Sequence, residues 1–203
     1  MVRQWRFHVS AGILCLDFAN TVSWRRSEAP IDRIKSAADL FSWARQAGAI
    51  TAASERRLAR EALANPRQAA RLLAEARALR ETVFEVFAAR SEGRAPGNRD
   101  LLHLQRWIRV ALGHSRLTGF AGSYRWQLES DSELQSVLWM VALSVESLLR
   151  SAELGFIGQC DGRDCRWLWI DRTRNHSRRW CDMAVCGNRA KAQRHHKRML
   201  RAS

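Results

Sequence analysis

Four cysteines near the C-terminus constrain this chain more than any other feature of its sequence. Cys160 and Cys165 are separated by four residues, Cys181 and Cys186 by another four, and 15 residues lie between the two pairs. Two close pairs of thiolates can approach a zinc ion from two sides and complete its tetrahedral coordination. The spacing therefore predicts a Zn²⁺ site, and four sulfur ligands leave no open position for catalysis.

Other arrangements of these thiols remain open. Two disulfides would require an exported protein, but the first residues contain no continuous apolar stretch typical of a signal peptide, and a reducing cytosol favours metal ligation. Four cysteines also hold iron–sulfur clusters. Three histidines nearby can replace a sulfur ligand in principle, although exposed positions in a basic segment are the simpler expectation for His176, His195 and His196.

The charge of the chain predicts a polyanionic partner. The formal net charge is +14, and 31 of the 34 basic residues are arginine. Residues 160–203 contain 12 basic and four acidic residues, against 22 and 16 in the preceding part. This excess favours nucleic acid first and an anionic membrane surface second. The apolar stretch over residues 137–143 is too short to span a bilayer, so we expect a cytoplasmic protein without a membrane segment.

The remaining sequence predicts a mainly α fold. Glycine and proline are sparse, with 11 and three residues, and apolar positions recur at helical spacing in several segments. We expect a helical domain over residues 1–155, with a strand over residues 124–128, a further strand over residues 5–9 and one small β-hairpin. Ser36, Pro66 and Ser132 are expected at or near helix starts, and Gly48 at a helix end.

Residues 156–203 are expected to form a small zinc finger of the treble-clef or ribbon type. The segment "RWLWID" predicts a strand, and "RTRNHSRRW" the turn and return of a hairpin between the two knuckles. Asn188 is a suitable N-cap for a final helix. Trp167, Trp169 and Trp180 are expected to form a small core around the metal. Because this core is small, the ion should supply about 10 kcal/mol or more of the folding energy.

The final helix is expected to bind nucleic acid. Its basic residues recur every three or four positions and so fall on one face, where they suit phosphate contacts along double-stranded DNA. Arginines of the preceding loop extend this surface, while Arg189 can also anchor the finger to a carboxylate or bind a phosphate. The candidate nucleic-acid-binding residues are Arg174, Arg178, Arg179, Arg189, Lys191, Arg194, Lys197, Arg198 and Arg201.

Asp17 and Asn20 are polar residues within an otherwise apolar run of the N-terminal region. Buried polar groups require partners, so the two are expected to form a cap or a core hydrogen bond, or else a ligand pocket in a sensor domain. Cys15 is expected to be a small core residue. The chain has no phosphate-binding glycine loop, nucleophile elbow or zinc-protease box, so no catalytic residues are assigned and an enzyme is not expected.

The C-terminal segment "WCDMAVCGNRAKAQRHHKR", with "CDGRDCRWLWID" before it, closely resembles the CGNR zinc-finger family of bacterial proteins. The tetrad that names the family is Cys186, Gly187, Asn188 and Arg189 in this chain. Upstream, "GILCLDFANTV" and "DLFSWARQAG" resemble the ABATE domain that usually precedes this finger. The resemblance implies a helical domain joined to a zinc finger, in a family described as stress-induced transcription regulators.

Three functions are compatible with these features. The first is a DNA-binding transcription regulator whose N-terminal domain senses a small-molecule effector or forms a homodimer. The second is an RNA- or ribosome-associated protein that uses the same basic finger. The third is an enzyme whose pocket lies in the helical domain, with a purely structural finger. The first is the leading expectation.

Overall fold

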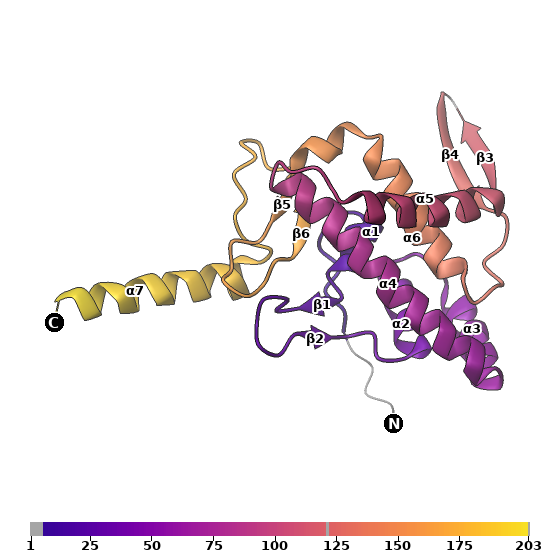
Figure 1. The fold of residues 1–203 in the computed structure, drawn as a ribbon, viewed down its shortest axis with the longest axis horizontal. Coiled ribbons are helices and arrows are strands. Elements are labelled where there is room, and N and C mark those ends of the chain that lie inside the picture. Colours follow the sequence, from indigo (N-terminus) through magenta and orange to yellow (C-terminus); the bar gives the residue numbers. More distant parts are fainter. Residues whose placement is uncertain (1–5, 121, 203) are drawn as a thin grey trace.

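The computed structural model describes residues 6–120 and 122–202, except for the side chains of residues 120, 123, 195–197 and 200–202. Helices form a body that carries short two-stranded sheets, which confirms the mainly α fold class (Figure 1). The helices of the body are α1 (Leu14–Ala19), α2 (Ala37–Gln46), α3 (Ala52–Ala64), α4 (Pro66–Ser91), α5 (Asn98–Gly113) and α6 (Ser136–Leu149). The strands are β1 (Val22–Ser23), β2 (Ile31–Asp32), β3 (Ser115–Phe120), β4 (Ser123–Leu128), β5 (Ile157–Gln159) and β6 (Leu168–Ile170).

Helix α2 begins at the predicted capping box. The Ser36 hydroxyl accepts a hydrogen bond from the Asp39 backbone N–H, and the Asp39 carboxylate accepts one from the Ser36 N–H. These reciprocal bonds satisfy two backbone donors that a helix start leaves without partners. The helix ends before Gly48, whose φ of +74° suits a glycine and lets the chain turn away. Both predicted ends of α2 are therefore confirmed.

Helices α3 and α4 also begin at residues that favour a helix start. The Thr51 hydroxyl caps α3 by accepting from the Ser54 N–H, and Pro66 occupies the first turn of α4, where its missing N–H costs nothing. The prediction at Ser132 is wrong, because α6 begins at Ser136 after Gln135 and no side-chain cap is present. The Ser132 N–H instead bonds the Ser130 hydroxyl within the preceding loop.

The core of the body lies where α1, α4 and α6 meet. Leu16 and Phe18 of α1, Val83 and Phe87 of α4 and Val141 of α6 are fully buried in one cluster. Most positions of α6 are buried, as its apolar sequence predicts for a central helix. Helices α2 and α3 close one end of this core and α5 packs beside α4 (Figure 1).

The predicted strand near residue 124 is part of a hairpin that stands out from the body. β3 and β4 pair antiparallel, with Leu117 opposite Trp126 and Ser115 opposite Leu128 (Figure 1). Leu128 packs against the body, whereas Leu117 and Tyr124 are exposed. The strand expected over residues 5–9 is not formed by residues 6–9, and Trp5 lies outside the described residues.

The β5–β6 hairpin corrects the expected layout of the finger. The strand in "RWLWID" is present as β6, but it pairs with β5, which precedes the first cysteine pair, and not with a return strand after it. The first knuckle is therefore the turn of this hairpin. Ile157, Leu168 and Ile170 are buried in the core of the helical body, so the finger is built directly onto that body.

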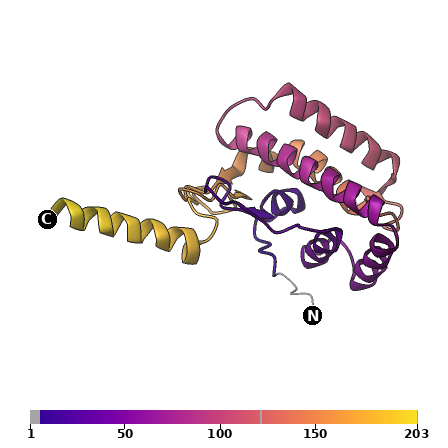
Figure 2. The same cartoon turned by 60° about the horizontal axis from the view of Figure 1, so that its bottom comes forward.

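Helix α7 (Asn188–Ala202) extends away from the body with its C-terminal end farthest out. The second view, turned about the horizontal axis, shows the same projection (Figure 2). A helix of 15 residues is about 22 Å long. Its contacts with other elements are concentrated at its first turns, beside the π-helical turn η2 (Met183–Gly187) that leads into it. The structure thus presents a long helix to its surroundings from a fixed base.

Candidate metal centre and the basic helix

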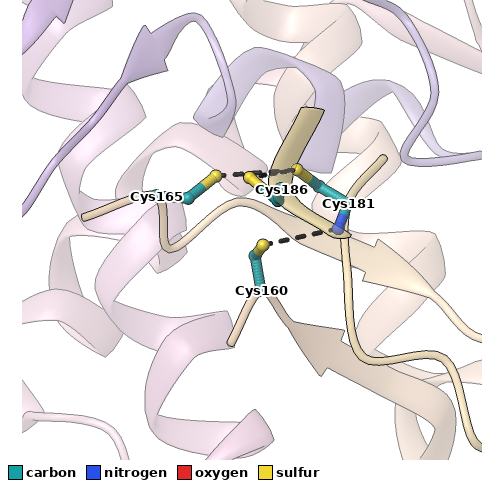
Figure 3. A group of neighbouring side chains, drawn as sticks. All are labelled: Cys160, Cys165, Cys181 and Cys186. Carbon is teal, nitrogen blue, oxygen red and sulfur yellow. Dashed lines mark hydrogen bonds between the residues drawn. The ribbon is translucent and has the colours of Figure 1, made fainter. Parts of the chain in front are cut away.

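The four cysteines of the two knuckles converge on one point (Figure 3). All four are buried, and their sulfur atoms lie within 4.8 Å of one another. Cys160 and Cys165 flank the turn between β5 and β6, whereas Cys181 precedes η2 and Cys186 lies inside it. The fold therefore brings together two segments that are 15 residues apart in the sequence.

The spacing of the sulfur atoms suits a zinc ion. The Sγ atoms of Cys165 and Cys181 are 3.6 Å apart, and those of Cys181 and Cys186 are 3.5 Å apart. A tetrahedral site with Zn–S bonds of about 2.3 Å requires sulfur–sulfur separations of about 3.8 Å. A disulfide would require about 2.0 Å, and all four cysteines are free thiols. The cluster is suited to binding Zn²⁺ through Cys160, Cys165, Cys181 and Cys186.

The surroundings of the cluster stabilise a thiolate at Cys160. Hydrogen bonds from the Cys165 and Cys181 thiols lower the pKa of Cys160, and backbone N–H groups of Cys181 and Gly162 donate to its Sγ, each at 3.4 Å. The pKa of Cys181 is raised instead, because its hydrogen bonds with the Cys160 and Cys165 sulfur atoms favour the neutral thiol, as do burial and the neighbouring negative charge. Four thiolates can therefore coexist here only around a cation, which is the condition that a zinc ion meets.

Close packing around the sulfur atoms leaves little room for larger side chains. A Cβ atom at Gly162 would lie 3.2 Å from the Sγ of Cys186 and 3.3 Å from the Sγ of Cys160. Trp169 is buried against the cluster, and Trp24, Trp167 and Trp180 pack around it partly buried. The predicted tryptophan core around the metal is confirmed, with Trp24 of the helical body added to it.

The second knuckle is held by an N-cap at Asp182, which precedes the predicted position at Asn188. The Asp182 carboxylate accepts hydrogen bonds from the N–H groups of Ala184 and Val185 and so begins η2. Asn188 has helical backbone angles (φ −67°, ψ −39°) and lies within the continuous helix, so the prediction that it is an N-cap is wrong. An aspartate directly before a helical segment was the signal that would have identified the true cap.

The loop between β6 and the second knuckle is organised by Asp171 and Arg178. The Asp171 carboxylate accepts hydrogen bonds from the N–H groups of Thr173 and Arg178, both at 2.9 Å. The Arg178 guanidinium donates to the carbonyl groups of Trp180 and Cys181 and lies over the Trp169 ring. These contacts give Arg178 a structural role beside the metal ligands.

Arg189 connects the finger to the helical body. Its guanidinium carbon lies 4.2 Å from the centre of the Trp24 ring, a distance typical of a cation–π contact. The partner is thus an aromatic ring and not the carboxylate that the sequence analysis considered. Trp24 itself has a φ of +57°, an uncommon value for a non-glycine residue. No local sequence pattern identifies this contact.

The other candidate nucleic-acid-binding residues occupy different environments. Lys191, Arg194 and Arg198 have exposed side chains along α7, and the Arg194 Nε donates to the Ala190 carbonyl at 3.3 Å. Arg174 is exposed in the loop after β6, and Arg179 forms an ion pair with Asp161 at 2.8 Å. Lys197 and Arg201 belong to α7, but their side chains lie outside the described residues.

Of the three histidines considered as alternative ligands, His176 is described, and it is not part of the sulfur cluster. The Nδ1 atom of His176 lies 2.8 Å from the Asp171 carbonyl oxygen, and its ring stacks on Phe156 with centroids 4.1 Å apart. The side chains of His195 and His196 lie outside the described residues.

Asp17 and Asn20 are both buried and both hydrogen-bonded. One carboxylate oxygen of Asp17 accepts from the N–H groups of Ser10 and Ala11 at 2.8 and 2.9 Å. The Asn20 amide exchanges two hydrogen bonds with the backbone of Leu168. These bonds supply the partners that burial requires. Those of Asn20 also join the segment after α1 to the finger.

Two family models match successive parts of the chain. The model of the ABATE family, described as "Putative stress-induced transcription regulator", matches residues 12–152. The model of the CGNR zinc finger matches residues 157–199, which include all four clustered cysteines. Neither description names an enzyme. No curated protein matches the chain. Within the described residues, no helix has the length and apolar character needed to cross a membrane. The chain belongs to the ABATE family of regulators and carries a C-terminal CGNR zinc finger.

Proposed function

We propose that this protein is a transcription regulator that binds double-stranded DNA through α7 and requires zinc to do so. The observation that carries the proposal is the composition and position of this helix. It contains six basic residues and no acidic residue, and it projects from the cysteine cluster into open space (Figures 1 and 2). A polyanion is the partner that such a surface attracts most strongly.

The dimensions of α7 support a duplex as the partner. A major groove about 12 Å wide admits one α-helix, and a helix about 22 Å long crosses it with residues left to contact both phosphate backbones. Lys191, Arg194 and Arg198 are spaced by three and four residues, so they share one side of the helix. Their exposed side chains can neutralise phosphates along the same groove.

The need for zinc follows from the instability of α7 on its own. Like charges spaced by three or four residues destabilise an isolated helix, and this helix has few apolar residues to bury. Its start is held by Cys186 in η2 and by Arg189 over Trp24. Zinc binding at the four cysteines fixes this start and so sets the direction in which the basic side chains point.

The proposal is tested by the salt dependence of binding. Zinc-loaded protein is titrated against a duplex of about two helical turns at several salt concentrations, with fluorescence anisotropy as the readout. Replacing Lys191, Arg194 and Arg198 by alanine should make the slope of log K against log salt shallower by about three. The matched control replaces Arg56, Arg60 and Arg67, exposed residues of α3 and α4, and removes the same charge.

Equal binding by the two triple variants would contradict the proposal. Stronger binding of the wild type to single-stranded RNA than to the duplex would instead support the RNA-associated function. Selection of bound fragments from genomic DNA, in parallel with an RNA pool, then identifies the preferred sequence. Loss of duplex binding after zinc chelation, with recovery on addition of zinc, tests the requirement for the metal.

A further inference from the structure

A basic pocket lies at the base of α7, between the finger and the helical body. Its volume is about 260 Å³. Trp24 belongs to the body, whereas the other residues of the pocket come from the two knuckles and the first turns of α7. Four arginines and two tryptophans dominate its lining: Arg163, Arg179, Arg189, Arg194, Trp24 and Trp180.

Two of the arginines in this pocket are oriented by aromatic rings. Arg189 lies over Trp24, and the guanidinium of Arg179 lies 5.4 Å from the centre of the Trp180 ring. Stacking of this kind uses the face of the guanidinium and leaves the N–H groups in its plane available for an acceptor. Within the described part of the chain, the side chains of Arg163 and Arg189 form no hydrogen bond or ion pair.

The pocket has more positive than negative side chains. Two carboxylates, Asp161 and Asp164, line it with the four guanidinium groups, and Asp161 is already paired with Arg179. The backbone N–H of Asn188 at the start of α7 is not available to an anion, since it bonds the carbonyl groups of Met183 and Val185. The side chains of Arg163 and Arg189 thus supply the free donors.

A second role for these arginines has to be separated from anion binding. Cys186 also lines the pocket, and a zinc ion with four thiolates carries net negative charge. Nearby guanidinium groups can stabilise that charge without binding any ligand. The two roles differ in what a substitution changes: the loss of a neutralising arginine weakens zinc retention, and the loss of a ligand-binding arginine weakens anion affinity.

We propose that this pocket binds a phosphate group through Arg163, Arg189 and Arg194. Planar guanidinium groups match the oxygen atoms of phosphate and form short, charge-assisted hydrogen bonds with them. The phosphate belongs either to a free nucleotide or to the backbone of bound DNA. The inference goes beyond duplex binding by the exposed side of α7, because Lys191 and Arg198 do not line the pocket.

The first arm of the test uses small ligands. Zinc-loaded full-length protein is titrated calorimetrically with adenosine monophosphate and with inorganic phosphate. We expect saturable binding that Arg163→Ala weakens about tenfold or more, as the loss of a charge-assisted hydrogen bond requires. Arg163→Lys should restore part of the affinity. Arg116→Ala, which removes an exposed arginine from the distant β3–β4 hairpin, should have no effect.

The second arm uses duplex DNA. If the phosphate comes from the DNA backbone, Arg163→Ala should reduce the salt slope of duplex binding by about one, while Arg116→Ala leaves it unchanged. A variant with Lys191 and Arg198 replaced by alanine should lose duplex affinity and still bind any small phosphate ligand. The two variants therefore show separately whether α7 binds the duplex and whether the pocket binds phosphate.

The proposal is overturned if Arg163→Ala behaves like Arg116→Ala in both arms. Zinc content is measured for every variant. If Arg163→Ala weakens zinc retention but leaves phosphate affinity and the salt slope unchanged, the arginine neutralises the metal cluster and the pocket is not a phosphate site.

Discussion

The side-chain amide of Asn20 forms two hydrogen bonds with the backbone of Leu168. The Nδ2 atom donates to the Leu168 carbonyl oxygen at 2.8 Å, and the Leu168 N–H donates to the Oδ1 atom at 2.9 Å. The two residues are 148 positions apart, in the segment after α1 and in β6. A buried amide thus takes the place of a neighbouring strand and joins the helical body to the finger. Trp167 adds a third bond by donating from its Nε1 to the Val22 carbonyl at 2.8 Å.

Replacing Asn20 by alanine should destabilise the protein by about 2–4 kcal/mol, because it leaves the N–H and carbonyl of Leu168 buried without partners. The free energy of unfolding in denaturant gives the measurement. Asn175→Ala, in the exposed loop of the finger, is the matched control and should have little effect. Equal stability of the two variants would show that Asn20 does not hold this junction.

The zinc content of cysteine variants should show that the four clustered cysteines bind the metal and that Cys15 does not. Cys181→Ser removes one ligand and should abolish tight zinc binding, whereas Cys15→Ala should retain one zinc ion per chain, as elemental analysis can measure. Cys15 is fully buried between helices, and burial raises its pKa to about 12, so it remains a neutral thiol.

Chelation of zinc should increase hydrogen exchange in η2 and the first turns of α7 while α4 and α6 stay protected. The reason is that the helical core does not include the sulfur ligands. Complete unfolding on chelation would instead show that the metal holds the whole chain together.

Gly158 should tolerate no larger residue. A Cβ atom there would lie 2.7 Å from the Nε1 and 2.9 Å from the Cε2 of Trp169, a rigid ring buried beside the cysteines. We expect Gly158→Ala to cost about 1–3 kcal/mol and to weaken zinc retention. Gly155→Ala is the control, since nothing lies within 4 Å of a Cβ atom at that position. Thermal unfolding with and without zinc measures both effects, and similar curves for the two variants would contradict the prediction.

The ion pair between Asp32 and Arg80 should contribute a pH-dependent part of the stability. Burial by itself raises the pKa of Asp32, but the hydrogen bonds and charge of Arg80, at 2.7 and 2.9 Å, outweigh burial and hold that pKa below its ordinary value. The stabilisation is therefore fully present above a pH of about 4, the unfolded value, and is lost as pH falls through the lower folded value.

Asp32→Asn should reduce the free energy of unfolding by about 2–4 kcal/mol at neutral pH, because it leaves the buried Arg80 with Glu81 alone as a counter-charge. The difference from the wild type should narrow in acid. Denaturant titrations of both proteins from neutral pH to about pH 3 provide the measurement. If the difference in free energy of unfolding between the two proteins did not change with pH, the substitution would act through altered packing and not through loss of the charge.

Much of the fold and of the metal centre could be predicted because the responsible interactions are local. The capping box at Ser36, the start of α4 at Pro66 and the end of α2 before Gly48 each depend on residues within one turn of each other. The four zinc ligands are recognised by spacing alone, since zinc accepts two close pairs of thiolates from any backbone that brings them together.

The wrong predictions of the hairpin and of the cap have different causes. The sequence of β6 fits a strand, but it does not say which neighbour completes the hairpin, and β5 is favoured because Ile157 and Ile170 are buried together in the helical core. Asn188 is a good cap by type, yet Asp182 lies at the true start of the turn. Burial in the core decides the partner of β6, whereas the position at which the helical turn begins decides the cap.

The sequence by itself determined a helical body, four sulfur ligands and an acid-free basic helix, because periodicity, cysteine spacing and charge are properties of the chain. Only the tertiary structure decided that Asn20 binds β6, that Arg189 lies over Trp24 and that four arginines meet in one pocket. The first two of these contacts join segments more than 100 residues apart, and no local energy term distinguishes them from the many alternatives that packing excludes.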